Sequence, residues 1–134
     1  MKSNFFIPLF VLSLILAACA SGPENVSEDI TPLELVQRAQ EATDRNRYGT
    51  ALQYYEIILD KFSYNLEMIF TAKYEIAFIH YKQRKYDLAR SEFIDLLAQY
   101  DTPDEELLPA QFKRLSTIVL EQIDEKTKGK KKSG

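Results

Sequence analysis

The sequence predicts an all-α domain built from stacked helical hairpins, and three observations support this fold class. Apolar residues in the segment 72–100 follow the period of two amphipathic helices, and the polar residues 82–85 between them leave room only for a tight reversal. Residues 47–59 match residues 85–97 position by position at a constant offset of 38, so the hairpin occurs twice. No segment shows the regular alternation of a half-buried strand.

The first 18 residues are predicted to be a cleaved signal peptide outside the fold. Residues 5–17 form an apolar run that is too short to cross a bilayer comfortably as a mature helix. The residues Leu16-Ala17-Ala18-Cys19 resemble a bacterial lipobox. The resemblance implies that Cys19 is lipidated on sulfur, becomes the new N-terminus and anchors the chain to a membrane. The alternatives are an ordinary secretory signal or a signal anchor with a chance cysteine.

Residues 19–31 are predicted to be a flexible tether, because they are polar and contain glycine and proline. Thr31 is expected to cap the first helix, with Pro32 at its first position and Glu34 as the capping-box partner. Residues 101–104 are expected to interrupt the helical pattern. The expected helices cover residues 32–46, 48–62, 66–84, 86–99 and 109–125.

The repeated positions carry two kinds of side chain. Small residues recur in the first helices, at Ala39 and Ala77, and in the second helices, at Ala51 and Ala89. Aromatic residues recur as the pairs Tyr48 with Tyr86 and Tyr55 with Phe93. This pattern resembles the tetratricopeptide repeat, a 34-residue helical hairpin. In that family small residues lie where the two helices approach, and aromatics lie where one hairpin packs on the next.

The resemblance implies an α-solenoid of about five helices, with two repeats and a capping helix within residues 32–125. The four residues beyond the usual period are expected in the turn around 62–66. His80 stands where the family usually has tyrosine, and we expect it to be a helix-packing residue.

The last expected helix has one apolar face and is predicted to cap the stack as a third first helix. Ser116 lies on that face, 39 residues after Ala77 and therefore near the repeat spacing. The face is formed by Phe112, Leu115, Ser116, Val119 and Ile123. Residues 126–134 contain five lysines and two glycines and are predicted to be a disordered tail. This basic tail indicates contact with anionic lipid or an acidic partner, or it serves only for solubility.

In tetratricopeptide proteins the first helix of each pair lines a concave groove for partners. Carried over by position, the partner-binding groove of the second repeat comprises Tyr74, Phe78, Tyr81 and Lys82. The first three residues form one stripe along a helix, which we call the aromatic stripe. The first repeat contributes a more polar wall, formed by Val36, Gln40, Thr43 and Asp44. The alternative is that the last helix folds back over the aromatic stripe and makes it part of the core.

The sequence predicts no enzyme, cofactor or metal site. It has one histidine, its only cysteine is assigned to the lipid, and it has no glycine-rich phosphate loop. One imidazole without cysteine or histidine neighbours is not a metal site. The net charge of −3 gives no general electrostatic case for binding nucleic acid.

A lipobox joined to tetratricopeptide helices resembles the BamD (YfiO) family, the lipoprotein subunit of the outer-membrane β-barrel assembly machine. The resemblance implies a lipid-anchored scaffold for protein–protein interaction that faces the periplasm from the cell outer membrane. Its partners would then be envelope proteins, including that machine. Two other functions stay open at this point. One is an adaptor of another cell-envelope or transport complex, and the other is a carrier of a small apolar ligand that uses the aromatic stripe.

Overall fold

The computed structural model describes residues 26–131, with side chains to residue 128, and this part of the chain is helical without strands. The α-helices are α1 (Pro32–Asp44), α2 (Tyr48–Lys61), α3 (Leu66–Lys82), α4 (Tyr86–Ala98) and α5 (Ala110–Lys131), and a 3-10 turn η1 (Glu105–Leu107) precedes α5. The predicted signal peptide, Cys19 and the tether up to residue 25 lie outside the described residues. No described helix is both long enough and apolar enough to span a bilayer.

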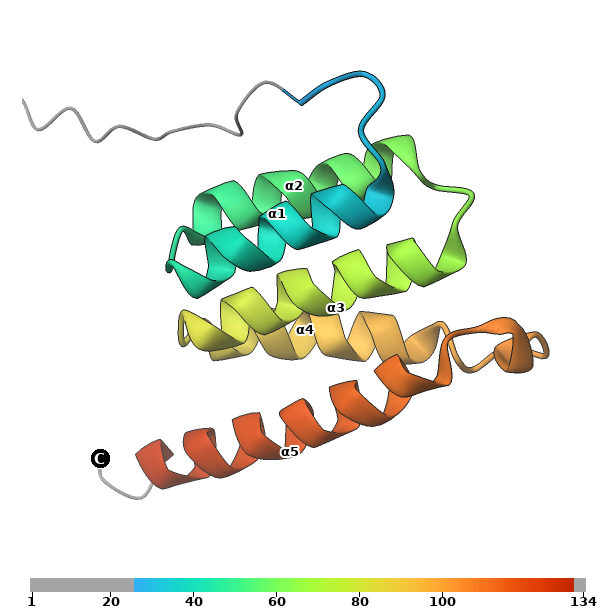
Figure 1. Cartoon of the computed structure of the whole chain (residues 1–134). Helices are drawn as coiled ribbons and strands as arrows, with labels where there is room; N and C mark the ends of the chain where they lie inside the picture. The colour runs from blue at the N-terminus through green and yellow to red at the C-terminus, as the bar shows by residue number, and fades with distance from the viewer. Residues whose placement is uncertain (1–25, 132–134) are drawn as a thin grey trace, which may run out of the picture.

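The helices stack as two hairpins and a final single helix (Figure 1). The hairpin of α1 and α2 packs on the hairpin of α3 and α4, and α5 packs on the far side of the second hairpin. One core cluster joins α1, α2 and α3, and a second cluster joins α3, α4 and α5. The predicted all-α, solenoid-like fold class is therefore confirmed, and α3 is the helix that both cores share.

The backbone repeats with the spacing seen in the sequence. Asn46 and Arg84, which are 38 positions apart, are the non-glycine residues of the described chain with positive φ, at 57° and 61°. Each lies in the turn of a hairpin. The following amides bond back in the same way, Arg47 N to Ala42 O at 2.8 Å and Lys85 N to His80 O at 3.0 Å. Both first helices thus end with the left-handed residue that closes many helix C-termini.

The repeat positions have the burial that the sequence predicts. The four small residues Ala39, Ala51, Ala77 and Ala89 are fully buried. The aromatic residues Tyr55 and Phe93 are also fully buried, and Tyr48 and Tyr86 are half-buried against the two cores. Ser116 of α5 is fully buried as well, so α5 places a small residue where the first two hairpins place alanine.

The end of the predicted tether is part of the fold, so its flexible assignment is wrong from residue 26 onward. Ile30 is buried in the first core, and Val26 packs against the same cluster. Ile30 directly precedes the cap residue and shares its cluster with Leu35, the arrangement of a hydrophobic staple. The Thr31 hydroxyl accepts from the Glu34 amide at 3.2 Å, which confirms the predicted cap.

The predicted disordered tail is wrong in its first part, because α5 continues to Lys131. Lysine is a good helix former, and lysines in a last turn are stabilised by the helix dipole, so the absence of apolar residues does not end the helix. The Thr127 hydroxyl also bonds back to the Ile123 carbonyl at 2.9 Å. Residues 132–134 lie outside the described residues, and contact of the tail with lipid or an acidic partner stays a prediction.

Candidate functional site

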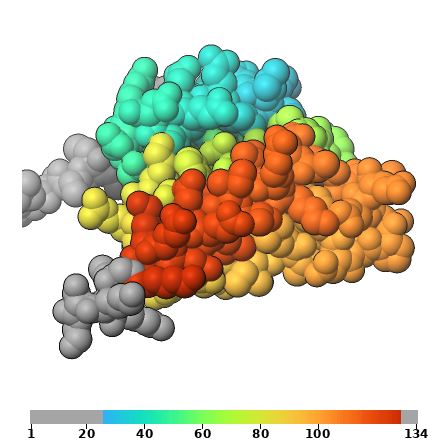
Figure 2. Space-filling view, turned by 90° about the horizontal axis from the view of Figure 1, so that it is seen from below, coloured from blue at the N-terminus to red at the C-terminus, as the bar shows by residue number. Residues whose placement is uncertain are grey.

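A groove of about 270 Å³ lies between the first helices of the two hairpins, and we call it the α1/α3 groove. Its lining residues are Gln40, Thr43 and Asp44 of α1 and Glu75, Phe78 and Lys82 of α3. Five of these six belong to the set that the tetratricopeptide resemblance implied. In Figure 2 the helices α1, α3 and α5 share one face, and α3 reaches the surface as a narrow strip between the other two.

Helical spacing explains which residues reach the groove. On α1 the lining residues are spaced i, i+3 and i+4, and on α3 they are spaced i, i+3 and i+7, so each set forms one stripe. Thr43 is buried, and its hydroxyl donates to the Ala39 carbonyl of its own helix at 2.9 Å. The polar groups that remain for a partner are therefore those of Gln40, Asp44, Glu75 and Lys82.

The aromatic stripe is not an open binding surface along its whole length. Tyr74 is only 8% exposed, and its ring lies 5.6 Å from Phe93 of α4 and 5.5 Å from Phe112 of α5. Its assignment as a groove residue is wrong, because α5 covers this end of the stripe and uses the ring as core. The fold-back alternative is the one that the structure supports here.

Phe78 and Tyr81 lie between the core and the surface. Their rings stack at 5.7 Å, both are half-buried, and both pack against the second core. The Tyr81 hydroxyl donates to the Gln122 side chain of α5 at 3.0 Å, so α5 holds this residue too. Of the aromatic stripe, Phe78 is therefore the residue that lines the α1/α3 groove.

Glu75 is the groove residue that the sequence analysis missed. It is half-buried, and burial raises the pKa of its carboxyl group, while the positive charge of Lys82 acts in the opposite direction. No hydrogen bond or ion pair of its carboxylate is found within the described residues. A signal was present in the sequence, because Glu75 is the only charged residue between Lys73 and Lys82 in an otherwise apolar stretch.

Tyr55 of α2 lies next to the groove from inside the fold. Its side chain is fully buried, and its hydroxyl has no hydrogen-bond partner within the described residues. Burial raises the pKa of the Tyr55 hydroxyl, and the nearby carboxylates of Glu75 and Asp44 raise it further. An unpartnered hydroxyl thus lies close to two unpartnered carboxylates.

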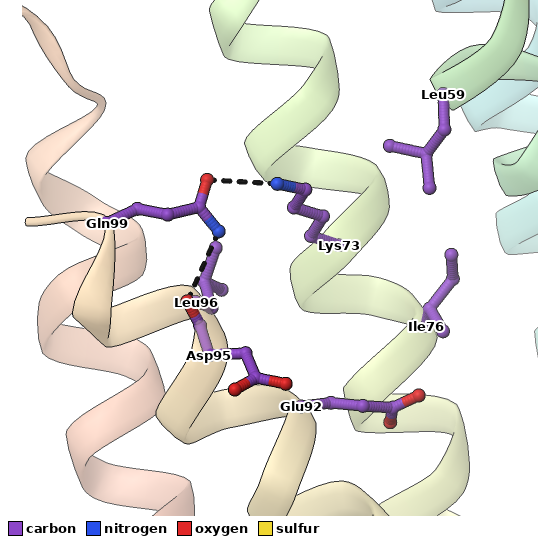
Figure 3. A pocket seen from close by; sticks show the side chains of 7 residues that line it. All are labelled: Leu59, Lys73, Ile76, Glu92, Asp95, Leu96 and Gln99. Carbon is purple, nitrogen blue, oxygen red and sulfur yellow. Dashed lines mark hydrogen bonds between the residues drawn. The ribbon is translucent and has the colours of Figure 1, made fainter.

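A second hollow of about 230 Å³ lies among α2, α3 and α4 (Figure 3). Its lining residues are Leu59, Lys73, Ile76, Glu92, Asp95, Leu96 and Gln99. The Lys73 ammonium donates to the Gln99 side chain at 2.9 Å, and Glu92 contacts the His80 ring nitrogen Nδ1 at 2.7 Å. His80 thus joins α3 to α4, as expected of a packing residue. Because these polar groups already have partners, this hollow is the weaker candidate.

The described residues contain no group of three or more histidine, cysteine, aspartate or glutamate side chains that could hold a metal ion. Cys19, the predicted lipidation site, lies outside the described part of the chain. The site of interest is therefore the α1/α3 groove, a polar surface with one aromatic wall.

Fold and groove together define a class: an all-α protein of stacked helical hairpins with an open groove across its first helices. No protein-family model matches the chain, and no solved structure matches it. The chain is 34% identical over 110 residues to an uncharacterized protein of Treponema pallidum (strain Nichols). The alignment covers 81% of this chain and 44% of that protein, so the chain spans less than half the length of this relative.

Proposed function

We propose that this chain is a lipid-anchored scaffold for protein–protein interaction, which faces the periplasm from the outer membrane and binds partners in the α1/α3 groove. The observation that carries the proposal is the origin of the groove walls. Gln40 and Phe78 are repeat equivalents, 38 residues apart, and so are Asp44 and Lys82. Equivalent positions of successive hairpins thus line one surface, as in proteins of tetratricopeptide type.

The packing of the aromatic stripe favours a scaffold over a carrier of a small apolar ligand. Tyr74 contacts Phe78, Phe93 and Phe112 at ring distances between 5.5 and 5.8 Å, so protein side chains occupy the space that such a ligand would need. The α1/α3 groove offers mostly polar groups instead. Binding sites for small apolar ligands are lined mainly by hydrophobic side chains.

The partner is proposed to be an envelope protein, and the first candidate is the β-barrel assembly machine, in line with the resemblance to the BamD family. The alternative is an adaptor of another cell-envelope or transport complex. Both proposals need the same groove and the same anchor at Cys19. The partner itself is what distinguishes them.

The test is capture of partners from native envelope extracts with the lipidated chain, followed by mass spectrometry. Gln40→Arg places a bulky charge in the groove at an exposed position, and Gln53→Arg makes the same change on the exposed side of α2. Recovery of a β-barrel assembly protein by the wild type and the Gln53 variant, with loss in the Gln40 variant, supports the first proposal. Recovery of only Pal-like or transport components supports the adaptor. Equal capture by both variants contradicts a role for the groove.

A further inference from the structure

The charges of the α1/α3 groove do not balance. Asp44 and Glu75 contribute two carboxylates, whereas Lys82 contributes the only cation among the lining residues. The Lys82 ammonium lies over the Phe78 ring, 5.8 Å from its centroid. One negative charge is therefore left without a counterpart in the groove, and an aromatic face that already attracts one cation lies beside it.

The unbalanced charge is held in a poorly hydrated place. Glu75 is half-buried without a hydrogen-bond donor, and burial raises the pKa of its carboxyl group. The Tyr55 hydroxyl, which is fully buried and close to both carboxylates, also has no partner. Buried polar groups in folded proteins nearly always have partners, so this set points to a group that completes it.

We propose that the α1/α3 groove binds a cationic side chain, arginine in particular, presented by an extended segment of the partner protein. A guanidinium group carries five donors in a planar fork, which suits two carboxylates, and its flat face can stack on an aromatic ring. Asp44 and Glu75 would accept its hydrogen bonds, and Phe78 would supply the ring. The inference rests on the proposed function and adds the chemistry of the partner.

A metal ion fits the groove less well than a guanidinium. Calcium takes six to eight oxygen ligands and magnesium demands an octahedral set, whereas the lining residues provide two carboxylates and one amide. The ammonium of Lys82 would also repel a divalent ion. Charge complementarity therefore favours a monovalent organic cation over a metal.

The inference can be tested by titration of the lipidated chain in a non-ionic detergent. The probe is an acetylated and amidated alanine pentapeptide with arginine at its centre, and the matched peptide has citrulline there, which has the same shape without the charge. NMR shifts of groove residues report the binding. The arginine peptide is expected to bind about tenfold or more tightly than the citrulline peptide, because a desolvated charge pair is lost in the latter.

Two isosteric variants locate the effect. Glu75→Gln removes the groove charge, and Glu56→Gln makes the same change at an exposed position of α2 that does not line the groove. The Glu75 variant is expected to bind the arginine peptide about tenfold more weakly, and the Glu56 variant is expected to bind it like the wild type. Circular dichroism checks that both variants fold.

Equal affinity for the two peptides overturns the inference, and so does equal affinity of the two variants for the arginine peptide. If both peptides shift the resonances of Gln40 and Phe78 equally, the groove binds peptides without reading charge, and the proposed scaffold function stands. If partner capture from envelope extracts is insensitive to Gln40→Arg, the scaffold function itself is contradicted. The two failures are therefore distinguishable.

Discussion

Replacement of Ser116 by alanine is expected to stabilise the protein. Ser116 is fully buried, and its hydroxyl has no hydrogen-bond partner within the described residues. It occupies the position on α5 where the first two hairpins have Ala39 and Ala77, which are also fully buried. A buried hydroxyl without a partner destabilises the folded state by about 1–3 kcal/mol. Alanine removes that hydroxyl and leaves almost no cavity.

The expected gain is about 1 kcal/mol or more, which corresponds to a rise in Tm of about 4–8 °C per kcal/mol for a domain of this size. Part of any gain comes from the higher helix propensity of alanine, which is at most about 0.5 kcal/mol over serine. Ser91→Ala measures that part alone, because Ser91 is exposed in the middle of α4. The difference between the two variants therefore isolates the buried hydroxyl.

The assay is thermal and chemical unfolding of both variants, followed by circular dichroism. Ser116→Leu serves as the opposite perturbation, since overpacking a close helix contact costs about 1–3 kcal/mol. If Ser116→Ala is no more stable than Ser91→Ala, the hydroxyl has a partner or is solvated. The reasoning about the small position of α5 is then refuted.

Three further predictions concern single groups. Because burial raises the pKa of Glu75 above its ordinary value of 4.5, wild-type stability should fall as pH rises through the folded-state pKa, and Glu75→Gln should remove this fall. Arg84→Gly should raise stability by about 0.5–1 kcal/mol in urea unfolding, because φ is 61° there. Tyr100→Phe should lower stability by about 1 kcal/mol in urea unfolding, because the Tyr100 hydroxyl donates to the Pro109 carbonyl at 2.7 Å. The matched Tyr64→Phe, at a residue 78% exposed, should have little effect.

The sign of the Glu75 effect follows from proton binding. Between pH 4.5 and the raised folded-state pKa, the folded chain binds the proton more tightly than the unfolded chain, so stability decreases with pH across that window. A pH profile of Glu75→Gln parallel to the wild type would show that another group is responsible. For Arg84, the control is Arg45→Gly, where φ is −89° and glycine should destabilise. Equal effects of the two glycine substitutions would contradict the assigned backbone strain.

The hairpins were predictable because local patterns determine them. Apolar period, the Thr31 cap and the 38-residue match placed α1 to α4 within two residues of their observed ends. The continuation of α5 through its lysines was missed, because an apolar period carries no information in a segment without apolar residues. The turn η1 was missed because acidic residues 104–106 were assigned only to the start of the next helix.

The candidate site was only partly predictable. Positional transfer from the repeat family placed Gln40, Asp44, Phe78 and Lys82 on one groove, since that depends on helix phase alone. The burial of Tyr74 depends on how α5 crosses the second hairpin, which no local pattern specifies. Glu75 was missed for a related reason, because the lack of a partner for a carboxylate is visible only once the surrounding helices are in place.

The most direct measurement of partner binding is site-specific photo-crosslinking on the lipidated chain in membranes of its native host. A photoreactive residue replaces Gln40 in the groove or Gln53 on the exposed side of α2. A specific protein adduct from position 40, absent from position 53 and identified by mass spectrometry, is the predicted result. Adducts from position 53 alone, or equal labelling from both positions, would contradict the groove between α1 and α3 as the surface that receives partners.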